Sequence, residues 1–274
     1  LAPRMMDFFS IFQYEFMVRA FAAGLIIAVI APAIGIFLVV KRYALLADAL
    51  SHIALLGVAF GVLFNINPVV GALILSVVAA LGIEWLRGER EIFGEAVLSL
   101  CLSGSLAIAL VILGLSGGLN VNLFSFLFGS ITTVSISDLM IVGLGGLFVV
   151  LLVGVLFKRL FLVSYDEDLA EASGLPTKMF NFILILLAAV TIAISMRIVG
   201  VLLIGALMVI PVLTASQFRL GFTKTALASI AISLVSVVVG IFTSFYADLP
   251  SGATVVVVAL ILFGMSLLFN RKHS

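Results

Sequence analysis

Charged residues are scarce in this chain, and their scarcity excludes an ordinary soluble domain. Only 10% of the 274 residues are Asp, Glu, Lys or Arg, whereas 64% are hydrophobic. A soluble domain of this length needs far more polar side chains to cover its core. Apolar runs of about 18 residues or more recur instead, which predicts an all-α polytopic membrane protein. The formal net charge of +1 gives no indication of nucleic-acid binding.

Residues that support self-contained chemistry are also few. The single cysteine, Cys101, excludes a disulfide within the chain. The phosphate loop of ATPases, Gly-x-x-x-x-Gly-Lys-Ser/Thr, is absent from the sequence, so the chain is not expected to hydrolyse ATP by itself. The two histidines are His52 and His273, the second in the C-terminal tail. An intramembrane enzyme would need a nucleophile or a fuller set of metal ligands, so we expect no catalytic residue and no permanently bound cofactor.

Nine hydrophobic segments are predicted to cross the membrane, joined by connections too short to form a second domain. We therefore predict a single transmembrane domain over residues 1–274. Residues 1–4 precede Met5 and are expected to be a vector-derived remnant. The predicted spans are residues 16–40, 44–64, 69–86, 95–115, 139–161, 179–196, 199–218, 222–245 and 252–269.

Basic residues predict the orientation of these spans. Loops on the cytoplasmic side of a membrane carry an excess of Lys and Arg. Of the fourteen basic residues, only Arg4, Arg19 and Arg197 fall on the side of the N-terminus. We therefore expect the N-terminus outside and the C-terminus in the cytoplasm. The eleven basic residues on the cytoplasmic side are Lys41, Arg42, Arg87, Arg90, Lys158, Arg159, Lys178, Arg219, Lys224, Arg271 and Lys272.

The second predicted span contains two ionisable side chains, Asp48 and His52, which lie four residues apart and so share one face of a helix. Ionisable groups inside a membrane are energetically expensive and usually face a pathway or a partner. A carboxylate oxygen and an imidazole nitrogen suit zinc or manganese, and the Ser51 hydroxyl lies beside them. A structural hydrogen bond between Asp48 and His52 explains the pattern equally well. Two ligands do not make a tight site, whereas four would do so if two copies of the chain faced each other across a two-fold axis.

The same span carries a pair of small residues, Gly57 and Gly61, also four residues apart. Small residues at this spacing allow another helix to approach the backbone closely. We therefore expect one face of this span to pack tightly against a neighbouring helix.

Two shorter segments are predicted to form helices that do not cross the membrane. The apolar part of residues 119–129 is too short for a bilayer of about 30 Å, so a short helix at the outer face is expected. In residues 164–176, Ser164 is predicted to cap an acidic helix that ends at Gly174. This cytoplasmic segment is either a docking element for a partner or a solvated acidic loop.

Four motifs, spread from the second span to the last, resemble those of the permease subunits of bacterial zinc and manganese ABC importers. Each motif alone is weak, but together they are specific and cover nearly the whole chain. They are Asp48, Ser51, His52 and Gly57 in the spacing D-x-x-S-H-x-x-x-x-G; Tyr165, Asp166, Ala170 and Gly174 in an aromatic-Asp-x-x-x-Ala-x-x-x-Gly segment; residues 199–203 leading to Ile210, Pro211, Thr214 and Ala215; and residues 250–253.

The resemblance implies an architecture and a set of partners. Such permeases are similar in fold to the vitamin B12 and siderophore importers, lie in the bacterial cytoplasmic membrane and form homodimers. They bind two cytoplasmic ATPase subunits, which hold the ATP, and receive metal from an extracytoplasmic metal-binding protein. The transported ion is Zn²⁺ or Mn²⁺, moved by alternating access. The residues around Asp48 are more similar to the zinc-type members, so zinc is favoured.

The resemblance also implies roles for particular residues. Asp48 and His52, with Ser51 beside them, would line the metal pathway. Asp166, Ala170 and Gly174 would form the coupling helix that seats in the ATPase. Asn120, Asn122 and Phe124 would belong to a half-helix near the outer gate. A stand-alone secondary metal transporter or channel is the alternative, and it would carry metal without any ATPase.

Overall fold

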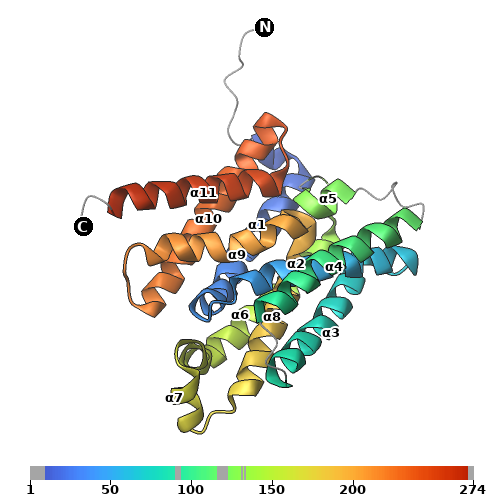
Figure 1. The fold of residues 1–274 in the computed structure, drawn as a ribbon. Coiled ribbons are helices and arrows are strands. Elements are labelled where there is room, and N and C mark those ends of the chain that lie inside the picture. Colours follow the sequence, from blue (N-terminus) through green and yellow to red (C-terminus); the bar gives the residue numbers. More distant parts are fainter. Residues whose placement is uncertain (1–9, 90–93, 116–122, 131, 133, 271–274) are drawn as a thin grey trace.

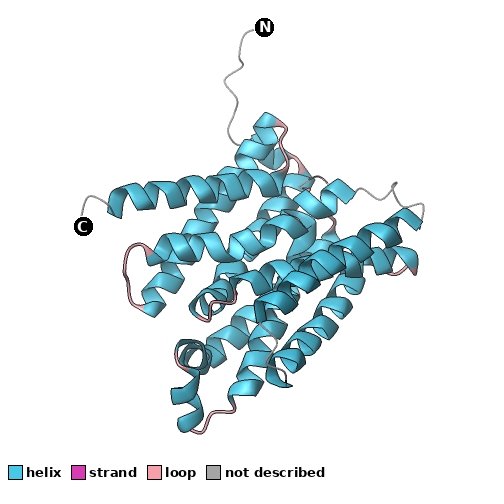
Figure 2. Cartoon of the chain, in the orientation of Figure 1, coloured by secondary structure: helices cyan, strands magenta, loops and turns pink. Residues whose placement is uncertain are grey.

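The computed structural model of the chain describes residues 10–89, 94–115, 123–130, 132 and 134–270, and these residues form helices and loops without a strand (Figures 1 and 2). Long apolar helices are the expected outcome, because a helix satisfies every backbone polar group internally in lipid. The elements are η1 (Ser10–Gln13), α1 (Glu15–Val40), α2 (Ala44–Leu63), α3 (Pro68–Glu89), α4 (Gly94–Leu115), α5 (Leu123–Phe128), α6 (Ile136–Tyr165), α7 (Glu167–Ala172), α8 (Thr177–Val199), α9 (Val201–Ser216), α10 (Phe222–Ala247) and α11 (Ser251–Asn270).

The long helices follow the order of the predicted spans. Among the described residues, seven helices are long and apolar enough to cross a membrane. The two others, α3 and α9, carry shorter apolar stretches, Pro68–Ile83 and Leu203–Ser216. The predicted all-α membrane fold is therefore confirmed, with nine as an approximate count of spans.

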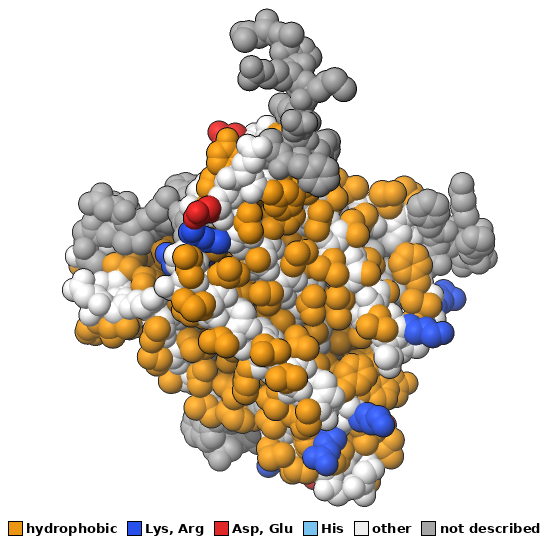
Figure 3. Space-filling view, turned by 180° about the vertical axis from the view of Figure 1, so that it is seen from behind, with side chains coloured by type: hydrophobic (Ala, Val, Ile, Leu, Met, Phe, Trp, Pro, Cys, Tyr) orange, Lys and Arg blue, Asp and Glu red, His pale blue; other side chains and the backbone are white. Residues whose placement is uncertain are grey.

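Burial separates the inner helices from the outer ones. Most side chains of α1, α2 and α8 are buried, whereas only a minority of those of α4 and α6 are buried. The exposed side chains of α6 include Leu144, Leu147 and Val155, as expected for a helix that faces lipid. Figure 3 shows hydrophobic side chains over most of one face, with the charged ones near its margins.

The two short helices lie at opposite ends of the bundle (Figure 1). The 30-residue helix α6 begins after α5 and ends before α7, and at 1.5 Å per residue it separates them by about 45 Å. The end that carries α7 also has an aromatic cluster, in which the Phe222 ring lies 4.5 Å from Phe161 and 5.5 Å from Phe37 between ring centroids. The C-terminal ends of α1 and α6 therefore meet the start of α10 beside α7.

A break between α8 and α9 lies at the end of the bundle where α5 packs. Gly200 joins these two helices with φ +91, a conformation that side chains other than glycine's rarely adopt. A Cβ at this position would lie 2.5 Å from the Leu127 carbonyl oxygen, so the end of α5 packs directly on the break. The Ser251 hydroxyl, at the start of α11, donates to the Ile198 carbonyl oxygen at 3.3 Å.

Candidate functional site

The helix that carries Asp48 and His52 lies among four others. Helix α2 packs against α3, α4, α8 and α9. Its contact with α3 is close: a Cβ on Gly57 would lie 2.5 Å from the Ala72 Cα, and one on Gly61 would lie 2.9 Å from the Pro68 Cα. The tight packing predicted from the glycine pair is thus confirmed, and it fixes one face of α2 against α3.

The opposite side of α2 is incompletely covered. Leu45, Asp48, Leu56, Phe60 and Leu63 are not buried, and their spacings of three, eight, four and three residues keep them on one side of the helix. They form a single stripe, which we call the open stripe. His52 falls on the same stripe with 9% of its surface exposed. Both predicted metal ligands therefore lie on the face of α2 that the rest of the chain leaves partly open.

Asp48 lies at the edge of the open stripe, against α9. A Cβ added to Gly205 of α9 would overlap the Asp48 Oδ1 atom, so the carboxylate occupies space that any other residue at position 205 would fill. The Ser51 hydroxyl donates to the Asp48 carbonyl oxygen at 2.8 Å, which engages its proton with the helix backbone. Ser51 retains only its oxygen lone pairs for a metal, and its role as a ligand stays a prediction.

His52 has a free ring nitrogen. Its Nδ1 atom is buried and has no hydrogen-bond partner among the described residues. Neither a hydrogen bond nor an ion pair joins His52 to Asp48 in this part of the chain, so the structural pair considered above is not formed. Buried polar atoms without a partner are rare and require an explanation. A cation held between the carboxylate and the imidazole would use both groups.

The site has few ligands within one chain. Across the described residues, His, Cys, Asp and Glu side chains form no group of three or more that could hold a metal ion. An incomplete set of ligands is compatible with an ion that passes through, because conduction needs binding weak enough for release.

The predicted coupling helix is present as α7, with one correction to its start. Helix α6 continues through Ser164 to Tyr165, so Ser164 does not cap α7. Asp166 leaves the helical conformation instead, with φ −149, and its Oδ1 accepts a hydrogen bond from the Leu169 backbone N–H at 2.9 Å. Asp166 is therefore the N-cap, and its side chain replaces the one expected from Ser164.

The other two predicted coupling residues anchor α7 and end it. The Ala170 side chain is fully buried and lies on the inner face of α7. Gly174 has φ +79, its N–H donates to the Glu171 carbonyl at 2.9 Å, and the Leu175 N–H donates to the Ala170 carbonyl at 3.1 Å. This pair of bonds is a Schellman ending, which favours glycine at that position. Leu169 is 53% exposed, so α7 presents an apolar side chain outward.

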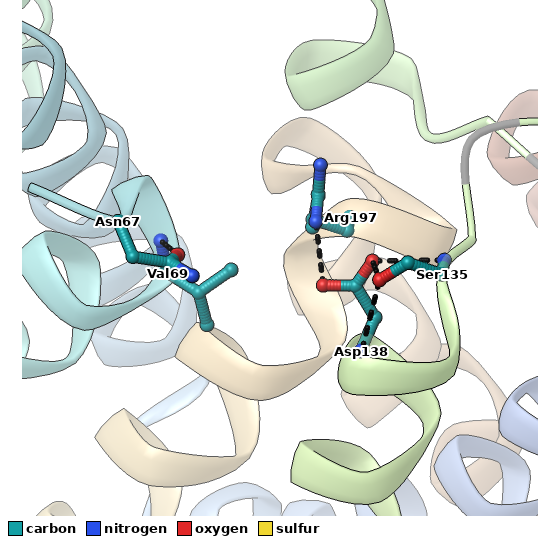
Figure 4. Close-up of polar contacts among 5 residues, drawn as sticks. All are labelled: Asn67, Val69, Ser135, Asp138 and Arg197. Carbon is teal, nitrogen blue, oxygen red and sulfur yellow. Dashed lines mark hydrogen bonds and ion pairs between the residues drawn. The ribbon is translucent and has the colours of Figure 1, made fainter.

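The opposite end contains a cluster that sequence reasoning missed (Figure 4). Arg197, in the last turn of α8, donates to the Asp138 carboxylate at 2.5 Å, and its guanidinium lies 5.9 Å from the centre of the Phe126 ring of α5. Asp138 also accepts from the Ser135 N–H at 3.0 Å, in a capping box that starts α6. The Ser-x-x-Asp spacing ahead of an apolar run was the available signal. The cluster connects α5, α6 and α8.

The residues predicted near the outer gate are only partly described. Asn120 and Asn122 lie outside the described residues. Phe124 lies in α5, the short helix expected in this segment, and its role stays a prediction.

A helical membrane bundle with an ionisable pair on one inner helix, and with short helices at opposite ends, is the kind of architecture that a membrane permease requires. The model of the ABC 3 transport family matches residues 13–270. The chain therefore belongs to the ABC 3 transport family.

Relatives and a solved structure agree with this assignment. The chain is 31% identical over 261 residues to the high-affinity zinc uptake system membrane protein ZnuB of Haemophilus influenzae, covering 95% of this chain and 100% of that protein. It is 28% identical to the manganese transport system membrane protein MntC of Halalkalibacterium halodurans, covering 97% and 91%. It is also similar to PsaBC from Streptococcus pneumoniae in complex with Fab, with a TM-score of 0.87, 27% identity and coverage of 96% and 95%.

Proposed function

We propose that this chain is the membrane-spanning subunit of an ATP-driven importer of a divalent transition-metal ion. The observation that carries the proposal is the position of Asp48 and His52 on the open stripe of α2, with no bond between them. The similarity to a zinc-uptake and a manganese-transport protein supports the choice of ion class.

The two side chains have complementary effects on a cation in the membrane. The negative charge of Asp48 attracts a divalent ion and offsets part of the cost of removing its water. The neutral imidazole of His52 supplies a nitrogen lone pair, which zinc and manganese both accept. Two copies of the chain, paired through their open stripes, would bring four such ligands to one ion. We therefore propose a homodimer whose metal pathway lies between the two α2 helices.

Energy has to come from another subunit, because the sequence contains no phosphate loop. Helix α7 is the proposed docking element for cytoplasmic ATPase subunits: it is capped at Asp166, ended at Gly174 and exposes Leu169. With α7 inside, α5 and the Arg197 cluster face outward, where an extracytoplasmic metal-binding protein would deliver the ion. This orientation agrees with the excess of basic residues predicted on the cytoplasmic side. ATP-driven movement of α7 would then alternate access to the site.

Reconstitution tests the proposal. The chain is placed in liposomes with its native ATPase and its metal-binding protein, and uptake of radioactive Zn²⁺ is measured with and without ATP. Uptake is expected only when all three proteins and ATP are present. Metal flux through the chain alone would contradict the proposal and favour a stand-alone transporter or channel.

The same liposomes identify the ion. We expect unlabelled Zn²⁺ to compete with uptake more strongly than Mn²⁺, as the similarity around Asp48 to zinc-type members implies. Stronger competition by Mn²⁺ would reassign the ion to manganese and leave the mechanism unchanged.

A further inference from the structure

A buried lysine lies where α1, α7 and α8 meet. Lys41 is the C-cap of α1, and only 5% of its side chain is exposed. Lysine is almost never buried unless its ammonium group is paired. Here the Nζ atom donates to the Glu167 Oε2 atom at 3.0 Å and also to the Asn181 Oδ1 atom.

The three side chains form a closed network. The Asn181 amide N–H donates to the other carboxylate oxygen of Glu167, Oε1, at 2.7 Å. Glu167 therefore accepts from both partners, and each pair within the trio is bonded. Since Glu167 lies in the first turn of α7 and Asn181 in α8, the network fastens α7 to the end of α1 and to the start of α8.

The network lies a short distance along the chain from the predicted metal ligands. The turn between α1 and α2 is tight: Arg42 has φ +61, and the Tyr43 N–H donates to the Leu38 carbonyl at 2.7 Å. The Lys41 ammonium also lies 5.3 Å from the centre of the Tyr43 ring. Helix α2 starts at the next residue, and Asp48 follows one turn later. A displacement of Lys41 therefore displaces the start of the helix that carries Asp48.

We propose that Lys41 is a positioning residue that transmits movement of α7 to the start of α2, and so to Asp48 and His52. The inference rests on the proposed function, in which a partner ATPase moves α7. When α7 moves, the Lys41 ammonium group either moves with Glu167 or remains buried without a counter-charge. Leaving a buried charge unpaired is strongly unfavourable, so the end of α1 follows α7. Asn181 extends the same constraint to α8, which packs against α2.

The test uses the full complex in liposomes, with ATPase and metal-binding protein, and measures metal ions imported per ATP hydrolysed. In the Lys41→Met variant, which keeps the aliphatic stem and removes the charge, this ratio is expected to fall on the order of ten-fold. The ATPase should still copurify in the wild-type proportion. Lys41→Arg retains the charge and should recover most of the ratio. The control is Lys224→Met, which removes an exposed lysine from the start of α10 at the same end.

Each outcome decides the inference. An unchanged ratio in Lys41→Met overturns it, and so does loss of the ATPase, because the network would then serve docking rather than transmission. If the Lys41→Met chain itself does not fold, Asn181→Leu removes one member of the network without altering the surface of α7. An assembled Asn181→Leu complex with the wild-type ratio overturns the inference. If the wild-type complex imports no metal, the proposed function fails first, and the inference falls with it.

Discussion

At the scale of residues, the surroundings of Asp48 depend on a glycine in another helix. The shared face of Asp48 and His52 could be predicted from their four-residue spacing, because helical periodicity is local. The approach of Gly205 to the carboxylate could not, since it joins residues from helices far apart in the sequence. The Arg197–Asp138 pair was missed for the same reason, although each residue lies near the end of its own helix.

The Gly205→Ala substitution tests the space around Asp48. The added methyl group overlaps the carboxylate, so the side chain must move or the helices must separate. We expect lower metal uptake and a loss of roughly 1–3 kcal/mol in stability, measured by thermal unfolding of the complex. Gly154→Ala is the control, because a Cβ there meets no atom within 4 Å. Unimpaired uptake with Gly205→Ala would show that the position of the Asp48 carboxylate is unimportant.

The Asp138→Asn substitution tests the Arg197 cluster. It removes the charge from a carboxylate whose side chain is 5% exposed and weakens its bonds to Arg197 and Ser135. A loss of about 1–3 kcal/mol in the free energy of unfolding is expected. The matched control is Glu15→Gln, which breaks the ion pair between Glu15 and Arg19. The Glu15 side chain is 85% exposed, so this ion pair contributes at most about 1 kcal/mol. Equal effects of the two variants would refute the structural importance of the buried pair.

At the scale of elements, the order of the helices followed from hydrophobicity, whereas one helix start did not. The long helices, the short helix α5 and the capped helix α7 all appear where the sequence predicts them. The start of α7 differs because Ser164 is buried within α6. The chain leaves the helical conformation only at Asp166, whose side chain then provides the cap. Serine and aspartate are both good caps, so residue type alone could not distinguish them.

Gly174 provides a test of α7 as an element. With φ +79, a valine at this position is strained by its backbone alone, at about 1–2 kcal/mol, although the surrounding space is open. We expect Gly174→Val to distort the end of α7 and reduce the amount of ATPase that copurifies. Gly174→Asn is the control, because asparagine tolerates this conformation. Full copurification of the ATPase with Gly174→Val would argue against docking at α7.

At the scale of the whole molecule, the open stripe of α2 is the face through which we propose that two copies of the chain pair. Homodimer formation was predicted from the family resemblance and from the small number of ligands in one chain. The structure contributes the face: Leu56 and Phe60 continue the stripe beyond His52 and are incompletely buried. The sequence indicated both faces, because Asp48 and His52 mark the stripe and Gly57 and Gly61 mark the packed face, but it could not show that α3 covers the glycine face.

Cross-linking tests this arrangement. In a Cys101→Ser background, which removes the only native cysteine, Leu56→Cys is expected to form a disulfide between two copies of the chain. The product is a dimer on a non-reducing gel that disappears on reduction. Leu147→Cys, on the exposed face of α6, is the control and should stay monomeric. Preferential cross-linking through Leu147→Cys would place the dimer interface on α6 instead.

The central claim is that a metal ion crosses the membrane past Asp48 and His52. The most direct measurement is the uptake of radioactive Zn²⁺ into liposomes by the complete complex carrying both Asp48→Ala and His52→Ala. Loss of both ligands is expected to reduce metal uptake on the order of a hundred-fold, since a charge and a coordinating nitrogen are removed together, while the ATPase still copurifies. Wild-type uptake by this double variant would contradict the claim.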